Sequence, residues 1–359
     1  MPALALRSKA QYSDCDEQRA IKRAMFMAWN LALPVPVEYG GKIVADVGWD
    51  RKTNRVWAAA PATYDGLIAL ATAATPKMHT IWMSKYDFNN NTLGNNWIDM
   101  WSLKGDPQGG TYPGAASTAY VHAAIDPGVP YVGPPLVGGE TTRSVVGIEI
   151  QGINNGGAAP MAFLVYDRIM VYCNSPLFAG TTTMTNTVTP TRGGLGLGVQ
   201  PIITTQTAFG TSVNLTNYTY KAYGGATGRS LTVPGTNGNM FGTTTASATV
   251  PATCNPGSLS ATGWTPFLPL LAGDSGIISL TSYTTDVTTT GAICWVLAKP
   301  IVIMSNRVGQ RAYIQDLLTQ HPVLHSVPDD ACLSFLTASF NDASTSASTT
   351  GLGLVTLRG

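Results

Sequence analysis

The sequence predicts a mainly β protein: an antiparallel β-sandwich or jelly roll with an N-terminal helix and long irregular loops. From residue 144 onward, β-branched and aromatic runs alternate with clusters of Gly, Pro, Asn and Thr, a pattern typical of short strands joined by turns. Thr makes up about a quarter of residues 181–290 and suits exposed strand faces. Helical periodicity is clear only near the start of the chain.

Residues 1–45 are predicted to form a helix and an arm. Asp14 can cap the helix and Glu17 follows three residues later, which resembles a capping box. Apolar residues then recur at helical spacing until Pro34 ends the helix near Leu33. The helix carries too few basic residues to favour DNA or a membrane surface. Packing on its own protein or on a neighbour is the favoured interpretation.

Residues 46–135 are predicted to hold short strands and a long loop region, with a short helix over residues 64–74. Residues 91–135 are irregular, and such segments in ordered proteins usually bind something or lie along a neighbour. Trp97 and Trp101 are large apolar side chains in this loop. They either pack in the core beneath the loop or anchor a contact between subunits.

Residues 136–310 are predicted to form the β-sandwich domain. Its densest run, FLVYDRIMVY at residues 163–172, contains Asp167 and Arg168. Neighbouring residues in a strand point to opposite faces, so these two cannot act as one acid–base dyad. We expect each to find a separate partner at a sheet edge or subunit boundary, where it would specify one arrangement of the chain.

Residues 311–359 are predicted to form a C-terminal extension. AYIQDLLTQH, residues 312–321, favours a short helix. A strand is expected near residues 331–340, and a Ser/Thr tract then precedes a last strand.

The chain is poor in charge. Of its 359 residues 11% are charged, and the formal net charge is +1, against about 25% charged residues in ordinary soluble proteins. No basic excess argues for nucleic acid, and no apolar run is long enough to span a membrane. The N-terminus lacks the features of a secretory signal. So much neutral surface predicts coverage by copies of the chain or by partners.

The five cysteines are widely spaced, at positions 15, 173, 254, 294 and 332. No pair has the spacing of a zinc or redox motif. The spacing favours buried free thiols in a protein made in a reducing cytoplasm.

Motifs for catalysis or cofactor binding are not evident. GGLGLG at residues 193–198 lacks the spacing and context of a nucleotide-binding loop. His321 and His325 are four residues apart, but Pro322 and the absence of a following Glu depart from the zinc-hydrolase pattern. No G-x-S-x-G elbow occurs, and no pair of carboxylates is indicated. We therefore expect no enzyme activity and no catalytic, cofactor-binding or metal-binding residues.

Several segments resemble, in their order, a group of tailed-bacteriophage virion proteins. WIDMWSLKGDPQGG at residues 97–110 precedes LVYDRIMVY at 164–172, and PFLPLLAGDSGIISLTSY follows at 266–283. The group has a similar W-x-D-x-W segment, a Y-D-R strand and an L-x-A-G-D-x-G segment. The resemblance covers about residues 97–305 and implies a head decoration or cement protein. It also implies that the tryptophan loop and the Y-D-R strand are architectural.

The residues and the resemblance together predict a non-enzymatic capsid decoration or cement protein that stabilises the head through many weak contacts. The expected partners are the chain itself, as a dimer or trimer, and phage capsid subunits, on the capsid exterior. A shell or tail and baseplate protein, and a receptor- or glycan-binding module, remain alternatives. The side chains expected to carry structural or interface roles are Trp97, Asp99, Trp101, Asp167, Arg168 and Trp264.

Overall fold

The computed structural model describes residues 4–6, 37–39, 42–43, 78–89, 97–133, 135–136, 143–153, 161–192, 196–207, 209–210, 213–232, 253–254, 266–305, 312–316, 325–339 and 347–358. Over these residues the regular elements are β-strands, most of them paired antiparallel. The prediction of a mainly β protein with antiparallel sheets is therefore confirmed.

Four sheets are formed. The central sheet of seven strands has the order β11-β16-β9-β19-β5-β14, with β7 beside β9: β5 (Trp97–Asp99), β7 (Ala119–Val121), β9 (Met161–Leu177), β11 (Gln200–Thr207), β14 (Thr253–Cys254), β16 (Thr289–Ser305) and β19 (Leu333–Ser339). The sheet of six strands has the order β17-β8-β20-β4-β6, with β18 beside β8: β4 (Met78–Asn89), β6 (Gly105–Asp106), β8 (Arg143–Ile153), β17 (Ala312–Asp316), β18 (His325–Ser326) and β20 (Ala347–Arg358).

The two smaller sheets complete the set. The four-stranded sheet has the order β10-β15-β12-β13: β10 (Gly180–Thr183), β12 (Leu215–Ala222), β13 (Arg229–Thr232) and β15 (Ile277–Thr285). The N-terminal sheet consists of β1 (Leu4–Leu6), β2 (Val37–Tyr39) and β3 (Lys42–Ile43), in which β1 and β2 run parallel.

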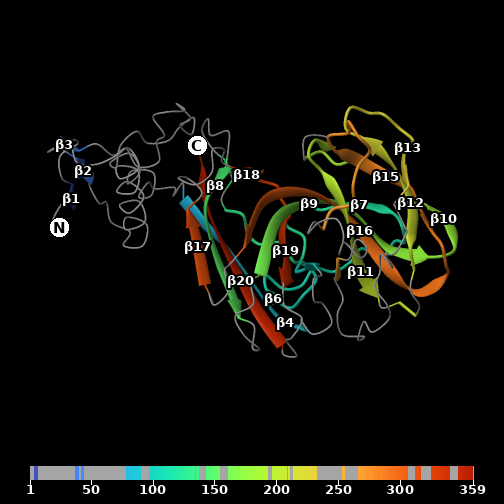
Figure 1. Cartoon of the computed structure of the whole chain (residues 1–359), viewed down its shortest axis with the longest axis horizontal. Coiled ribbons are helices and arrows are strands. Elements are labelled where there is room, and N and C mark those ends of the chain that lie inside the picture. The colour runs from blue at the N-terminus through green and yellow to red at the C-terminus, as the bar shows by residue number, and fades with distance from the viewer. Residues whose placement is uncertain are drawn as a thin grey trace.

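Two long strands, β9 and β16, run through the whole β-rich body. Each has 17 residues, and they pair antiparallel over most of their length. The six-stranded sheet packs beside one end of this pair and the four-stranded sheet beside the other (Figure 1). The body is thus two packed units that share their central strands.

The alternation of β9 explains its dense apolar sequence. Phe163 and Val165 belong to the core shared with the six-stranded sheet, whereas Leu164 and Tyr166 belong to a second core on the opposite face. A strand covered on both faces needs apolar residues at successive positions. Residue 169 is skipped in the pairing with β16, a β-bulge that follows the Asp–Arg pair directly.

The four-stranded sheet follows the ordinary half-buried pattern. Tyr218, Tyr220 and Tyr283 are buried against the second end of the long pair, which includes Trp295. The intervening positions of β12 and β15 are mainly Thr, Ser, Asn and Lys, and are less buried. The sheet therefore presents a polar face with little charge outward.

Two details differ from the sequence expectations. Residues 312–316, predicted to start a helix, form strand β17 against β8, because pairing along a long neighbouring strand overrides a weak local helix preference. Strands from the predicted loop region and from the C-terminal extension join the same sheets as the predicted sandwich domain. The predicted N-terminal helix and the helix over residues 64–74 lie outside the described residues.

No helix in the described part of the chain is long and apolar enough to cross a membrane.

Candidate functional site

The tryptophan loop and the Y-D-R strand meet in a buried polar cluster. Asp99, at the end of β5, is fully buried, and so is Arg168 on β9. Arg168 Nη1 donates to Asp99 Oδ2 at 2.6 Å, and Tyr166 Oη donates to Asp99 Oδ1 at 2.7 Å. The backbone N–H of Trp101 also donates to Asp99 Oδ1, at 3.1 Å. One carboxylate therefore joins the turn of the loop to two side chains of the central strand.

The guanidinium of Arg168 makes contacts with several further groups. It lies over the Trp101 ring, 4.2 Å from the ring centroid, which is a cation–π contact. Its Nε donates to His122 Nε2 at 3.1 Å. Burial opposes the charge of this group, but the neighbouring Asp99 carboxylate outweighs it and raises the pKa of Arg168.

Close packing of glycine against Trp101 accounts for part of the loop sequence. The N–H of Gly110 donates to the Trp101 carbonyl at 2.8 Å. A Cβ at Gly110 would overlap the indole ring, and a Cβ at Gly128, whose φ is +89°, would also approach it closely. Both positions need glycine so that the backbone can enclose the buried ring.

His122 extends the cluster toward solvent. Arginine can only donate hydrogen bonds, so His122 Nε2 must accept, and its Nδ1 carries the proton toward Asp126 Oδ2 at 2.9 Å. Burial lowers the pKa of His122 to about 4, with the charges of Arg168 and Arg192 acting in the same direction. The imidazole is therefore neutral at pH 7 and has a fixed tautomer.

Asp167 has its own partner on the other face. Arg192 Nη2 lies 3.3 Å from Asp167 Oδ1, and the N–H of Cys332 donates to the same oxygen at 2.9 Å. Arg192 also donates to the carbonyl oxygens of Arg168 and His122. Burial raises the pKa of Asp167, although Arg192 acts against this shift.

The expectation for the Asp–Arg pair is thus confirmed in one respect and wrong in another. Asp167 and Arg168 do find separate partners. However, β9 lies inside the sheet between β16 and β19 rather than at an edge, and both side chains are buried within one chain. Asp99 and Arg192 come from other segments, which the fold brings to the middle of β9.

Of the two roles left open for Trp97 and Trp101, core packing is the one that the structure shows. Trp97 and Trp101 are 4% and 1% exposed, so they pack in the core of their own chain and present no ring to a neighbouring subunit. Trp264 lies outside the described residues. The sequence offered no signal for His122 or Arg192 as partners, because no motif surrounds them. Tyr166 belongs to the Y-D-R strand, but the sequence did not indicate its hydrogen bond to Asp99.

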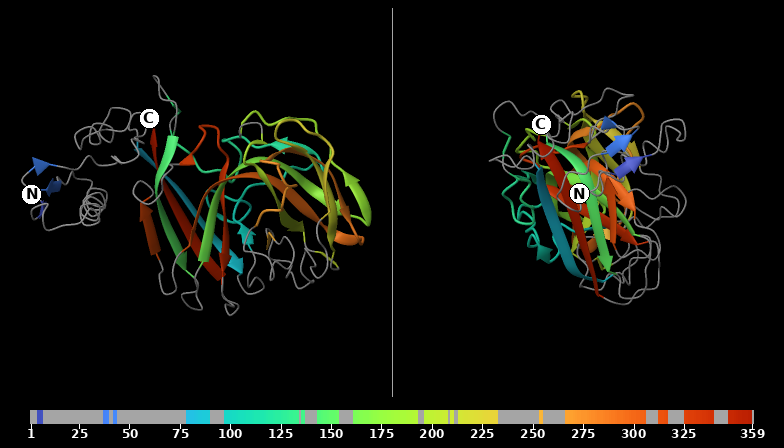
Figure 2. Two further views of the ribbon diagram at one scale, coloured as in Figure 1. Left: turned by 45° about the horizontal axis from the view of Figure 1, so that its top comes forward. Right: turned by 90° about the vertical axis from the view of Figure 1, so that its left-hand side faces the viewer.

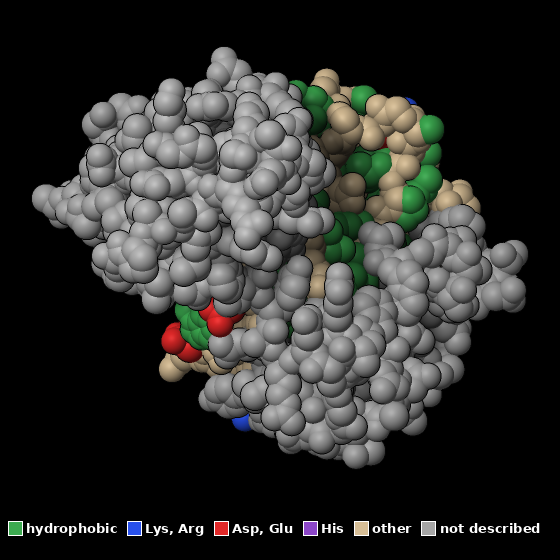
Figure 3. All heavy atoms as spheres, turned by 60° about the vertical axis from the view of Figure 1, so that its left-hand side comes forward, with side chains coloured by type: hydrophobic (Ala, Val, Ile, Leu, Met, Phe, Trp, Pro, Cys, Tyr) green, Lys and Arg blue, Asp and Glu red, His purple; other side chains and the backbone are tan. Residues whose placement is uncertain are grey.

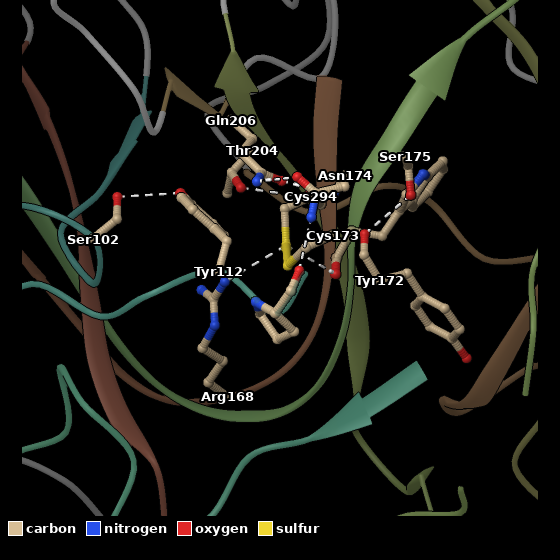
Figure 4. Close-up of a disulfide and its surroundings, with 12 residues drawn as sticks. Ser102, Tyr112, Arg168, Tyr172, Cys173, Asn174, Ser175, Thr204, Gln206 and Cys294 are labelled. Carbon is tan, nitrogen blue, oxygen red and sulfur yellow. Dashed lines mark hydrogen bonds between the residues drawn. A yellow bond between two sulfur atoms is a disulfide. The ribbon is translucent and has the colours of Figure 1, made fainter. Parts of the chain in front are cut away.

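The expectation of free thiols is wrong for two cysteines. Cys173 on β9 and Cys294 on β16 form a disulfide that lies between Arg168 and Tyr112 on one side and Asn174, Thr204 and Gln206 on the other (Figure 4). Widely spaced cysteines gave no hint of it, because antiparallel pairing brings residues 121 positions apart into contact. Cys332 is a buried free thiol, and burial raises its pKa.

Asn174, the residue that follows Cys173 of the disulfide, makes a further set of polar contacts. Asn174 has a φ of +48°, a conformation that asparagine tolerates better than most residues. Its N–H donates to Gln206 Oε1 at 2.7 Å, and its Nδ2 donates to the Pro113 carbonyl at 2.8 Å. These bonds connect β9 to β11 and to the loop before β7.

The chemistry of the cluster favours a structural role. Its charges are paired and buried, and its histidine is held between an arginine and an aspartate. A buried, satisfied polar network specifies a unique arrangement of the segments that supply it. Within the described residues, no group of three or more potential metal-ligating side chains gathers.

Comparison with protein-family models, curated proteins and solved structures finds no match to this chain.

Proposed function

We propose that this chain is a non-enzymatic structural component of a bacteriophage particle, of the capsid decoration or cement type. The proposal rests on the contact between the two motifs on which the resemblance to phage proteins is based. The W-x-D-x-W loop and the Y-D-R strand bind each other through Asp99 and Arg168. Residues that could have served catalysis are instead engaged in holding segments together.

The neutral surface supports the same proposal. Between Asn174 and Thr290 only five residues are charged, and the described surface in Figure 3 is largely hydrophobic and uncharged polar. Such a surface can be buried against neighbours with few charges to desolvate. Many weak contacts of this kind add up when the copies are held in a lattice.

The disulfide fits the proposed place on the capsid exterior. Disulfides persist in oxidising surroundings, which include the surfaces of virions, and are rare in the bacterial cytoplasm. A released particle is no longer surrounded by the reducing cytoplasm, so a chain on its surface would keep the Cys173–Cys294 bond.

The test is the copy number of the chain in purified particles, measured by mass spectrometry against the major shell protein. Hundreds of copies in a fixed ratio to the shell subunit are expected for a decoration or cement protein. A few to a few dozen copies would instead indicate a tail or baseplate component. Absence from particles would overturn the proposal.

A receptor- or glycan-binding module is the second candidate, favoured by one observation. Tyr131 and Tyr120, in the long loop region, are 67% and 39% exposed, and exposed aromatic rings are suited to stacking on sugars and other ligands. Saturable binding of soluble glycans, lost in Tyr131→Ala, would support this candidate. Particles that carry hundreds of copies but show no glycan binding would count against it.

A further inference from the structure

Among the described residues, no strand pairs with the outer edge of the four-stranded sheet. β10 is the end strand in the order β10-β15-β12-β13 and lies at the right-hand side of the molecule in Figure 1 and in the left view of Figure 2. Gly180, Thr181 and Thr183 are exposed and Thr182 is partly so. Natural proteins usually protect such edges with charge, proline or a bulge. Here no charged residue occurs between Asn174 and Arg192.

The hydrogen-bond pattern shows which backbone groups face outward. Met184 N donates to the Thr281 carbonyl at 2.8 Å, so in the antiparallel alternation Thr182 also bonds toward β15, opposite Tyr283. Thr181 and Thr183 lie at the intervening positions, where N–H and C=O point away from β15. The hydroxyls of Thr181 and Thr284 are 2.9 Å apart, as expected for the closer, non-hydrogen-bonded pair.

The open stretch has defined ends. Beyond it, Thr185 is already bonded on its outer side, to Ser117 and Ala119 at 2.9 and 2.8 Å. Before it, Gly180 has a φ of +108°, and Ala179 N donates to Thr288 Oγ1 at 2.8 Å. In the described part of the chain, the outward backbone groups of Thr181 and Thr183 have no partner of their own.

The opposite edge of the same sheet is different. On β13, Arg229 Nε lies 3.0 Å from Asp274 Oδ2, so this edge carries a charge and its counter-charge. Beside β10, by contrast, Phe178 is 57% and Val287 42% exposed. The Phe178 carbonyl accepts a hydrogen bond from Thr285 Oγ1, so Phe178 lies beside the end of β15.

We propose that β10 pairs with β10 of a second copy of this chain, antiparallel across a twofold axis at Thr182. Alternating donors and acceptors on an open edge are best satisfied by another strand. Because the strand is uncharged, a copy of itself meets no like-charge repulsion, and twofold dimers are the commonest oligomers.

Only one register uses every open group of both copies. With Thr182 opposite Thr182, each Thr181 exchanges two hydrogen bonds with the Thr183 of the other copy. If the axis lay at Thr181 or at Thr183 instead, the pairing would require Ala179 or Thr185, whose backbone groups are already engaged. The two four-stranded sheets would become one continuous sheet. This inference deepens the proposed function, since a cement protein needs contacts between copies.

The first test is the oligomeric state of the purified chain, by sedimentation equilibrium. The wild type is expected to dimerise reversibly. Thr181→Lys combined with Thr183→Lys would place lysines directly opposite each other across the axis and raise the dimer dissociation constant about tenfold or more. Thr232→Lys, on the exposed part of β13 at the opposite edge, should leave it unchanged. A monomeric wild type, or equal dimerisation of all three proteins, would overturn the proposal.

A second test gives a positive signal and does not depend on disrupting the contact. Thr182→Cys should form a disulfide-linked dimer on mild oxidation, because residues 182 face each other at a non-hydrogen-bonded pair. Thr232→Cys is the matched control, and equal cross-linking of the two variants would contradict the register. Both tests use the free protein, so their failure would leave the particle copy number to decide the proposed function separately.

Discussion

The centre of β9 and the four-stranded sheet use charge in opposite ways. At the centre of β9, Asp99, Asp167, Arg168 and Arg192 are all less than a tenth exposed. In the four-stranded sheet, buried tyrosines form the core and neutral Thr and Ser face outward. Charge is thus placed where segments distant in sequence must meet in one arrangement, and it is sparse where a surface is available for contacts.

Removing one charge from the centre of β9 is expected to have the largest effect on stability. Arg168→Ala would leave Asp99 buried without its partner and remove the cation–π contact with Trp101. We expect a loss of about 3–5 kcal/mol in the free energy of unfolding, measured by urea denaturation. Adding Asp99→Asn should cost less than the sum of the two single changes. Additive losses would contradict the network.

The Cys173–Cys294 disulfide links β9 to β16, the two strands that both packed units share. Its removal is expected to have the next largest effect on stability. Replacing Cys173 and Cys294 with Ala should lower the free energy of unfolding by about 2–4 kcal/mol, because the unfolded chain gains freedom. Reductant should destabilise the wild type by a similar amount and leave the double variant unaffected. Equal sensitivity of the two proteins to reductant would argue against the bond.

The pH dependence of stability should report on His122. The pKa of His122 is about 4 in the folded chain and about 6.5 in an unfolded one. Between these values the unfolded chain binds a proton that the folded chain does not. Stability should therefore fall as the pH drops from about 6.5 to about 4, by at most about 3 kcal/mol.

A substitution separates the effect of His122, together with its partner Asp126, from that of Asp167. The raised pKa of Asp167 acts in the opposite sense at acid pH, because its folded form takes up a proton more readily. His122→Gln removes the histidine and retains an amide that can donate and accept. Urea midpoints measured across this range should fall less steeply in the variant, and parallel curves would show that another group is responsible.

The smallest effect is expected in the four-stranded sheet. Arg229 is partly exposed and pairs with Asp274 near the surface, where screening by solvent leaves little net stabilisation. Arg229→Ala should shift the urea midpoint far less than Arg168→Ala does. Similar shifts for the two variants would remove the distinction between the two regions.

Sequence patterns predicted the strands well where each face of a strand is either buried or exposed along its whole length. Tyr218 and Tyr220 of β12 both point inward, and the dense run from Phe163 to Tyr172 is buried throughout. Local patterns failed at residues 312–316, where pairing with β8 decided the conformation. They also could not assign the tryptophans, since an apolar ring in a loop fits a core and an interface equally well.

The β class, the low charge of the surface and the separation of Asp167 from Arg168 could be predicted from the sequence, because strand periodicity and composition are local properties. The partners of Asp167 and Arg168 could not, because they depend on the tertiary fold. Asp99 lies 69 residues from Arg168, and Cys173 lies 121 residues from Cys294. Contacts at such distances depend on strand order and register, which are set by the packing of the whole chain rather than by neighbouring residues.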